Sequence, residues 1–355
     1  MKEIKSEDMQ ALALGCALLG SGGGGNPAYD LLIAEYALKQ HGPIKLISME
    51  ELAEDALVVP LAFVGAPLIA TEKLPSGREF QAIIAHLQKL DKKLVLMPAE
   101  IGGANGLSAF AVAAKMGLPV LDADTVGRAF PELQMSSCNL QGIKASPAYF
   151  ADSLGNLAQV DAEDSQAVER IGRHISISMG SSCGVAIYLM TGREAKTAAI
   201  PDTVSQALEI GNALLDARRE GANLIAKLLE ITDGVCLTIG VVHEVQQEIK
   251  KGFLQGSVKI RSEAREVELI YQNEYLLAKE GEEILATTPD ILAIVELESG
   301  TPITSDGLRY GLQVALLAIP APKMWQTDLG LTLVGPKYFG YPVSYIPIKN
   351  KENLV

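Results

Sequence analysis

Three carboxylates follow two predicted strands, at positions suited to acid–base chemistry. Glu100 comes shortly after a strand that ends at Met97, and Asp122 and Asp124 follow the next strand, Pro119–Leu121. Because parallel sheets bind ligands outside the carboxyl ends of their strands, we expect these side chains to share one edge. Neighbouring carboxylates raise one pKa, which provides a protonated acid and an ionised base. A helix cap at Asp124 and a solvated turn at Asp122 are the structural alternatives.

Four consecutive glycines precede the start of a predicted helix: Gly22, Gly23, Gly24 and Gly25. Residues without a Cβ let backbone N–H groups converge, so the loop and the following Asn26 are predicted to contact an anion or a developing negative charge. The loop lacks the Lys-Ser/Thr pair of a P-loop, and it follows a helix, which argues against a dinucleotide fingerprint. A hinge or close helix packing is the alternative interpretation.

Further polar residues and glycines near these segments are predicted to bind substrate: Gly102, Gly103, Asn105, Arg128, Glu132, Asn273 and Glu274. The Arg128 guanidinium is predicted to hold a substrate carboxylate, and an ordinary ion pair with Glu132 or with the carboxylates at the sheet edge is the alternative. Asn273 lies where one predicted strand turns into the next, and we expect it to pack against Glu100 in a cleft between two domains. Turn chemistry also explains an asparagine at this position.

The elements that position these residues alternate between helices and short apolar strands in the first half of the chain. Helical spacing of apolar residues predicts a helix over Ser6–Leu19 and another from Asn26 to about His41. Short β-branched runs then alternate with helical stretches up to Val120. This alternation predicts a three-layer α/β/α domain with a mostly parallel sheet over residues 1–168.

The second half changes character and becomes mainly β. Residues Thr203–Leu229 are predicted to be helical, with breaks at Gly211 and Gly221. After them, short strands are separated by turn signals, at Val235–Val242, Ser257–Ile260, Val267–Tyr271, Ile291–Val295 and Val314–Ile319. This spacing predicts a barrel or sandwich-like C-terminal domain over residues 169–355, after a boundary between about 160 and 175.

Composition and charge exclude several classes of function. The 355 residues carry a formal net charge of -13, which repels a polyphosphate backbone and argues against nucleic acid as a partner. The start of the chain lacks the pattern of a secretory signal, and the longest apolar run, Leu57–Ala70, is too short to cross a membrane. We therefore expect a cytoplasmic protein with a small-molecule substrate. The cysteines are far apart and are predicted to be buried free thiols: Cys16, Cys138, Cys183 and Cys236.

A series of motifs, in order along the chain, resembles the S-methyl thiohydantoin desulfurase-like family. The motifs are GSGGGGNP, GAP followed by Glu72-Lys73, PAEIGGANG, LPVLDADTVGRAFPELQM, YQNEYLLA, LRYGLQVALLAIPAP and LTLVGPKYFGY. Each motif is weak alone, but their order over nearly the whole chain makes the resemblance specific. The resemblance implies a three-layer α/β domain followed by a mainly β domain, in agreement with the periodicity.

The resemblance also implies a reaction, the hydrolytic desulfurisation of an S-methyl thiohydantoin or thiohydantoin to a hydantoin. For this reaction we expect Glu100 or Asp122 as the base, with the other carboxylate or Asp124 as the acid. The glycine-loop amides and Asn105 would stabilise charge. Two alternatives stay open: a non-catalytic ligand-binding subunit of a hydantoinase or oxoprolinase-like assembly, and a cyclic-amide hydrolase in which Glu100, Asp122 and Asp124 bind a divalent metal. No cofactor is predicted, and assembly with a second copy or a hydantoinase-like partner is left open.

Overall fold

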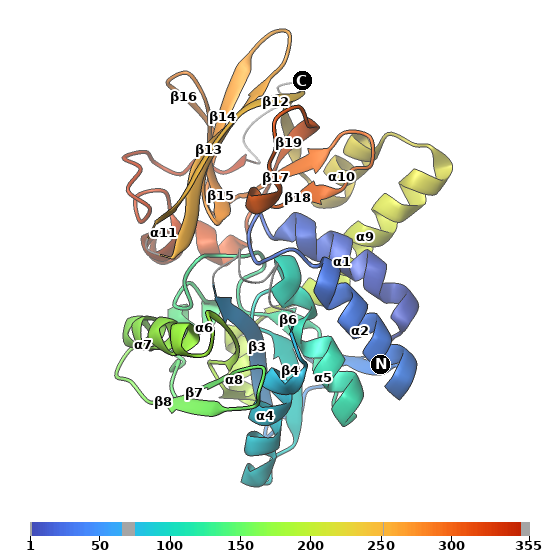
Figure 1. Ribbon diagram of the computed structural model, residues 1–355, viewed down its shortest axis with the longest axis vertical. Helices are drawn as coiled ribbons and strands as arrows, with labels where there is room; N and C mark the ends of the chain where they lie inside the picture. Colours follow the sequence, from blue (N-terminus) through green and yellow to red (C-terminus); the bar gives the residue numbers. More distant parts are fainter. Residues whose placement is uncertain (1, 66–74, 251, 349–355) are drawn as a thin grey trace.

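The computed structural model describes residues 2–65, 75–250 and 252–348, so Glu72 and Lys73 of one motif lie outside the described residues. The first of its two large sheets is mixed (Figure 1). Its strands β2, β5, β4 and β3 are parallel to one another, and the flanking strands pair antiparallel. In sheet order the strands are β1 (Lys2–Ile4), β2 (Ile44–Ile47), β5 (Val120–Leu121), β4 (Leu94–Pro98), β3 (Leu57–Gly65), β9 (Ser182–Ala186), β7 (Ala148–Ala151) and β8 (Leu157–Val160), with β10 (Met190–Thr191) beside β3.

Both faces of this sheet are buried, which explains why its central strands are almost continuously apolar. In β3, Val59 and Leu61 belong to one hydrophobic cluster, whereas Val58, Ala62 and Val64 belong to the cluster on the opposite face. The first cluster is covered by α1 (Met9–Leu19), α2 (Ala28–His41), α4 (Arg78–Leu87), α5 (Ser108–Met116), α9 (Thr203–Glu220) and α10 (Leu224–Thr232). The second is covered by α6 (Ser137–Leu140), α7 (Ser165–Ser178) and α8 (Gly192–Ala198). The α/β architecture with flanking helices is confirmed, with a parallel core inside a mixed sheet.

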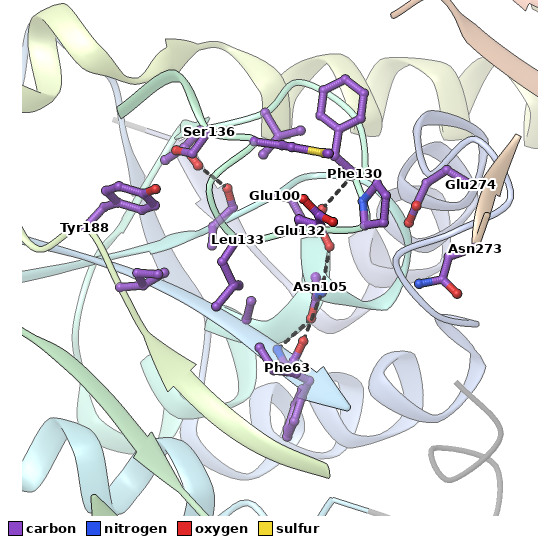
Figure 2. A pocket seen from close by; sticks show the side chains of 18 of the residues that line it. Phe63, Glu100, Asn105, Phe130, Glu132, Leu133, Ser136, Tyr188, Asn273 and Glu274 are labelled. Atoms are coloured by element: carbon purple, nitrogen blue, oxygen red, sulfur yellow. Dashed lines mark hydrogen bonds between the residues drawn. The ribbon is translucent and has the colours of Figure 1, made fainter. Parts of the chain in front are cut away.

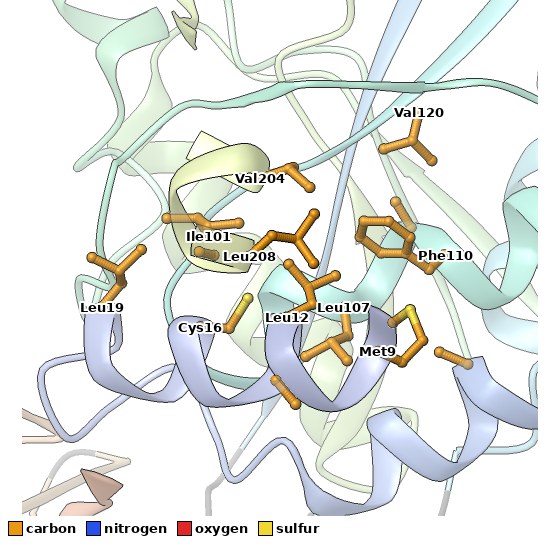
Figure 3. Packing of buried hydrophobic residues seen from close by; sticks show 14 of the residues in the cluster. Met9, Leu12, Cys16, Leu19, Ile101, Leu107, Phe110, Val120, Val204 and Leu208 are labelled. Atoms are coloured by element: carbon orange, nitrogen blue, oxygen red, sulfur yellow. The ribbon is translucent and has the colours of Figure 1, made fainter. Parts of the chain in front are cut away.

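The predicted break at Gly211 is wrong, because α9 continues through this residue to Glu220; the break at Gly221 is confirmed as the end of the helix. Gly211 lies where α9 crosses α1, and a Cβ built on it would stand 1.8 Å from the carbonyl oxygen of Ala11. Gly15 of α1 makes the reciprocal approach, 1.9 Å from the oxygen of Ala207. Figure 3 shows α1 beside Val204 and Leu208 of α9. The glycine therefore permits a close helix crossing, although it weakens the isolated helix.

We expect Gly211→Ala to destabilise the protein by about 3 kcal/mol, because overpacking forces the two helix backbones apart. Urea unfolding followed by circular dichroism measures this change. Asn212→Ala, at the exposed neighbouring position of the same helix, is the control and should change stability by less than about 0.5 kcal/mol. Equal stability of the two variants would show that the crossing adjusts without cost.

The C-terminal half forms an eight-stranded sheet in which every neighbouring pair is antiparallel. In sheet order its strands are β16 (Glu283–Thr287), β15 (Glu274–Glu280), β14 (Glu266–Gln272), β13 (Phe253–Arg261), β12 (Val235–Lys250), β19 (Gln313–Ile319), β17 (Ile291–Glu296) and β18 (Pro302–Ile303). Strand β15 also contacts β17, five strands away in this order, so the sheet is strongly curved. The mainly β, barrel-like C-terminal domain is confirmed, although the sequence analysis missed β15 and β16.

Short elements join the two sheets and complete the fold. Strand β6 (Ala123–Asp124) pairs with β11 (Ile200–Pro201), and α11 (Asp328–Val334) follows the last strand. The 3-10 helices are η1 (Ser6–Asp8), η2 (Gln88–Leu90), η3 (Gly103–Leu107), η4 (Ser305–Gly307) and η5 (Lys323–Gln326). All four cysteines are buried and free, as predicted. Among the described residues, no helix has the length and apolar character needed to cross a membrane.

Candidate active site at the domain junction

A cavity of about 110 Å³ lies where the carboxyl ends of β3 and β4 meet the start of β15. Its walls come from both halves of the chain, so a cleft between them is present. The polar side chains that line it include Glu100, Asn105, Glu132, Asn273 and Glu274, five of the residues that the sequence analysis singled out. Figure 2 shows these five side chains on one side of the cavity and Tyr188 on the other.

Glu100 is held at the edge of the sheet by two hydrogen bonds. The Asn105 amide donates to Oε1 over 2.7 Å, and the backbone N–H of Phe130 donates to Oε2 over 3.2 Å. Asn105 is itself fixed by β3, because its Oδ1 accepts from the N–H of Phe63 at 2.7 Å. Burial raises the pKa of Glu100 to about 7, although both hydrogen bonds oppose this shift. At neutral pH this carboxyl group can accept or release a proton.

Glu274 reaches the cavity from the second sheet, as the first residue of β15. Asn273 before it has a left-handed backbone, with φ of 57°, which turns the chain out of β14. The Glu274 side chain is buried, its Oε2 has no hydrogen-bond partner, and the backbone N–H of Gly24 donates to the carboxyl group. Burial and then the charge of Glu100 raise its pKa to about 8. The two domains thus bring two interacting carboxyl groups to one cavity.

The glycine loop lies behind Glu274 and is not among the residues that line the cavity. A Cβ at Gly23 would stand 2.0 Å from Oε1 of Glu274, and one at Gly22 would stand 2.5 Å from the Tyr275 ring. On its other side, a Cβ at Gly24 would stand 2.2 Å from the oxygen of Gly102. Gly25 accepts a hydrogen bond from Ala104 N–H, Gly103 packs on Gly24, and the exposed Asn26 accepts one from Ala28 N–H. The loop therefore fills the space between the two domains and supports Glu274.

Asp122 and Asp124 come shortly before Thr125 and Val126, which line the cavity, but the carboxylates of both residues bind protein groups outside it. Asp122 accepts from the N–H of Ser205 at 2.9 Å and from its hydroxyl at 2.5 Å, so it caps the start of α9. Asp124 is fully buried and accepts from the N–H groups of Ile101 at 2.7 Å and Gly127 at 2.7 Å. Burial raises the pKa of Asp124 to about 7. Neither residue lines the cavity with Glu100.

Arg128 is fully buried and does not line the cavity either. Its guanidinium donates to three backbone carbonyls, on Ala129, Pro289 and Asp290, rather than to Glu132. Glu132 does line the cavity, and its Oε2 accepts from the Tyr338 hydroxyl at 2.6 Å. The ion pair between Arg128 and Glu132 that the sequence allowed is wrong, because the guanidinium donates to these three carbonyl groups instead.

Several residues at the cavity carried no signal in the sequence. Tyr188 is buried with a left-handed φ of 56°, a rare conformation for a bulky residue. Arg173 of α7 lies at the cavity with its guanidinium over the ring of Phe253, 4.6 Å away. Tyr188 follows β9 and Arg173 belongs to α7, and neither position is part of a motif in the sequence. By contrast, burial raises the pKa of the nearby Cys138 thiol to about 12, so this cysteine stays protonated.

The charged groups of the site show no arrangement of the kind that binds a metal ion. Within the parts of the chain that the structure describes, no three His, Cys, Asp or Glu side chains are grouped as metal ligands would be. Glu100, Asp122 and Asp124, which the metal alternative placed together, bind separate protein groups. The chemistry that the described geometry supports best is therefore that of the Glu100 and Glu274 carboxyl pair.

Comparison with known proteins agrees with this two-part organisation. A crystal structure of a protein from Chromobacterium violaceum has the same fold, with a TM-score of 0.84 and 25% sequence identity, over 98% of this chain and 100% of that one. None of the curated proteins compared with this chain matches it. Two family models match in succession, the S-Me-THD-like N-terminal domain over residues 7–162 and the S-Me-THD-like C-terminal domain over residues 162–348. The resemblance noted in the sequence is thereby confirmed, and the chain belongs to the S-Me-THD-like family.

Proposed function

We propose that this protein is a hydrolase that converts an S-methyl thiohydantoin into a hydantoin and methanethiol. Glu100, as carboxylate, takes a proton from water, and the water oxygen bonds to the ring carbon between the two nitrogens. As the water oxygen bonds, the electrons of the ring C=N bond move onto the ring nitrogen. The tetrahedral species then loses its carbon–sulfur bond while Glu274, as the neutral acid, donates a proton to the departing sulfur. The remaining hydroxyl proton moves to the ring nitrogen, which gives the carbonyl group and N–H of the hydantoin. Proton transfer from Glu100 back to Glu274 restores the starting state of the pair.

The observation that supports this assignment most strongly is the Glu100 and Glu274 pair in a single cavity. Burial raises both pKa values, to about 7 for Glu100 and about 8 for Glu274, and the charge of Glu100 further disfavours ionisation of Glu274. A pair of this kind holds one proton near neutral pH. In that state one carboxyl group is an ionised base and the other is a neutral acid, and the proposed reaction needs both. The family name supports the ring substrate, and the cavity volume of about 110 Å³ suits a small ring.

Charge that develops on the ring nitrogen needs a hydrogen-bond donor in the cavity. The Asn105 amide already donates to Glu100, and the Gly24 amide to Glu274, so both act on the carboxyl groups. Asn273 uses its Oδ1 to accept from Leu254 N–H at 2.9 Å, which leaves its amide nitrogen on the cavity side in Figure 2. We assign this nitrogen as the donor to the ring.

The test is to incubate the purified protein with an S-methyl thiohydantoin and to measure free thiol and hydantoin together. Equimolar release of both, with ¹⁸O from labelled water in the new carbonyl group, is the expected result. A thermal-shift titration separates binding from turnover, because a ligand at 100 times its Kd adds about 2.7 kcal/mol of stability. Binding without thiol release between pH 6 and 8 would reject the hydrolase and favour the non-catalytic binding subunit.

A further inference from the structure

Arg128 connects the two domains directly behind the cavity. Its Nη1 donates to the carbonyl oxygens of Pro289 at 2.7 Å and Asp290 at 2.8 Å, both in the C-terminal domain. Its Nε donates to the oxygen of Ala129 at 2.9 Å, in its own domain. A planar guanidinium can hold several carbonyl groups in a fixed relative position, which a single ammonium group cannot do. The residue therefore fixes the N-terminal domain against the loop between β16 and β17.

The same side chain is linked to both carboxyl groups of the cavity. The Arg128 guanidinium lies 4.5 Å from the centre of the Phe130 ring, and the N–H of Phe130 donates to Glu100. On the other side, the charge of Arg128 acts on Glu274, yet Arg128 Nη2 and Glu274 Oε2 each lack a hydrogen-bond partner. The guanidinium of Arg128 is thus close enough to lower the pKa of Glu274, but the two side chains form no hydrogen-bonded ion pair.

We infer that Arg128 is a positioning residue, which fixes the domain junction and thereby the placement of Glu274 relative to Glu100. This inference rests on the proposed function for its effect on turnover. It differs from one of the two roles that the sequence allowed for Arg128, the contact with a substrate carboxylate, because this buried side chain does not line the cavity and its Nε and Nη1 donate to three carbonyl groups.

The test compares Arg128→Lys, which keeps the charge but not the three bonds, with Arg128→Met, which removes both. Arg218→Lys is the matched control, since Arg218 joins α9 to the C-terminal sheet through the carbonyl of Ser299, at 2.6 Å, but away from the cavity. The ligands are hydantoin and hydantoin-5-acetic acid, which differ by one carboxylate. Binding is measured by calorimetry, turnover by thiol release, and the Glu100 and Glu274 ionisation by carbon-13 NMR of labelled glutamates.

For Arg128→Lys we expect a soluble protein whose kcat falls about 10- to 100-fold, because small displacements of reacting groups have effects of this size. Both ligands should bind more weakly by the same factor, and the pKa values of the pair should change little. Arg128→Met should raise both pKa values, since a nearby positive charge is lost. Arg218→Lys should resemble the wild-type protein in all three measurements.

Three results would overturn the inference. Wild-type turnover and affinity in Arg128→Lys would show that the three bonds are not needed. A loss of affinity confined to hydantoin-5-acetic acid would show that Arg128 binds a ligand carboxylate. Failure of Arg128→Lys to fold would assign the residue to folding alone. If the wild-type protein binds neither ligand, the proposed function fails, but NMR still tests the inference: shifted glutamate resonances in Arg128→Lys would support it, and unchanged resonances would overturn it.

Discussion

Replacing Glu100 or Glu274 by glutamine should lower thiol release from an S-methyl thiohydantoin by about 10²- to 10⁴-fold, the usual contribution of a general acid or base. Glutamine keeps the size of each side chain but cannot exchange a proton. The effect should fall on kcat rather than on KM, because glutamine preserves the shape of the cavity and therefore the binding of the substrate, whereas the proton transfer is lost. The wild-type pH profile should be a narrow bell whose limbs belong to the pair, since the two pKa values lie near 7 and 8.

Glu244→Gln is the control for these variants, because Glu244 of β12 pairs with Lys259 of β13, outside the cavity. Its turnover should equal that of the wild-type protein. Asp122→Asn tests the sequence-level alternative. Since Asp122 caps α9 through Ser205, we expect this variant to lose stability more than turnover. A folded Asp122→Asn protein with the defect of Glu100→Gln would contradict the pair proposed here and favour Asp122 as the base.

The sequence predicted the parallel strands of the first sheet well, because their apolar pattern follows directly from burial, whereas the antiparallel strands β1, β7, β8 and β10 were not predicted. Strands β3 and β4 are covered on both faces, so almost every residue is apolar and the strands stand out. The break predicted at Gly211 is wrong because a glycine lowers the stability of an isolated helix, and this is the only effect that the local sequence reveals. The glycine is needed for the close approach of α1, whose residues lie some 200 positions earlier in the chain. Strands β15 and β16 were missed because they follow tight turns and carry charged residues at their ends.

The sequence predicted a residue of the candidate site only where its position depends on the neighbouring strand, and not where it depends on contacts with distant parts of the chain. Glu100 follows a parallel strand, and the strand-end rule placed it correctly at a cavity. The same rule applies to Asp122, but the start of α9, more than 80 residues later, binds its carboxylate away from that cavity. Glu274 comes from the other domain, so no spacing in the sequence could pair it with Glu100. The glycine run was recognised as unusual, whereas its contact with Glu274 depends on the folded domain junction.

The stability of the protein should fall as the pH rises from 5.5 to 8. Burial raises the pKa values of several carboxyl groups above those of the unfolded chain, to about 7 for Asp30, Glu100 and Asp124 and to about 8 for Glu274, and it also raises the pKa of Asp290. In this range the folded state holds protons that the unfolded state has released, so unfolding becomes easier as the pH increases. Each such proton contributes about 1.4 kcal/mol per pH unit to the slope.

Urea unfolding at half-unit pH steps measures this slope, and Glu274→Gln isolates one contribution to it. The glutamine cannot ionise, so the slope between pH 6 and 8 should become shallower by up to about 1.4 kcal/mol per unit. Glu244→Gln should leave the slope unchanged, because the Lys259 side chain lowers the pKa of Glu244 and both states are ionised there. A wild-type stability that is constant or rises over this range would mean that the cavity carboxyls ionise normally. The proton that the proposed reaction assigns to Glu274 would then be missing at neutral pH.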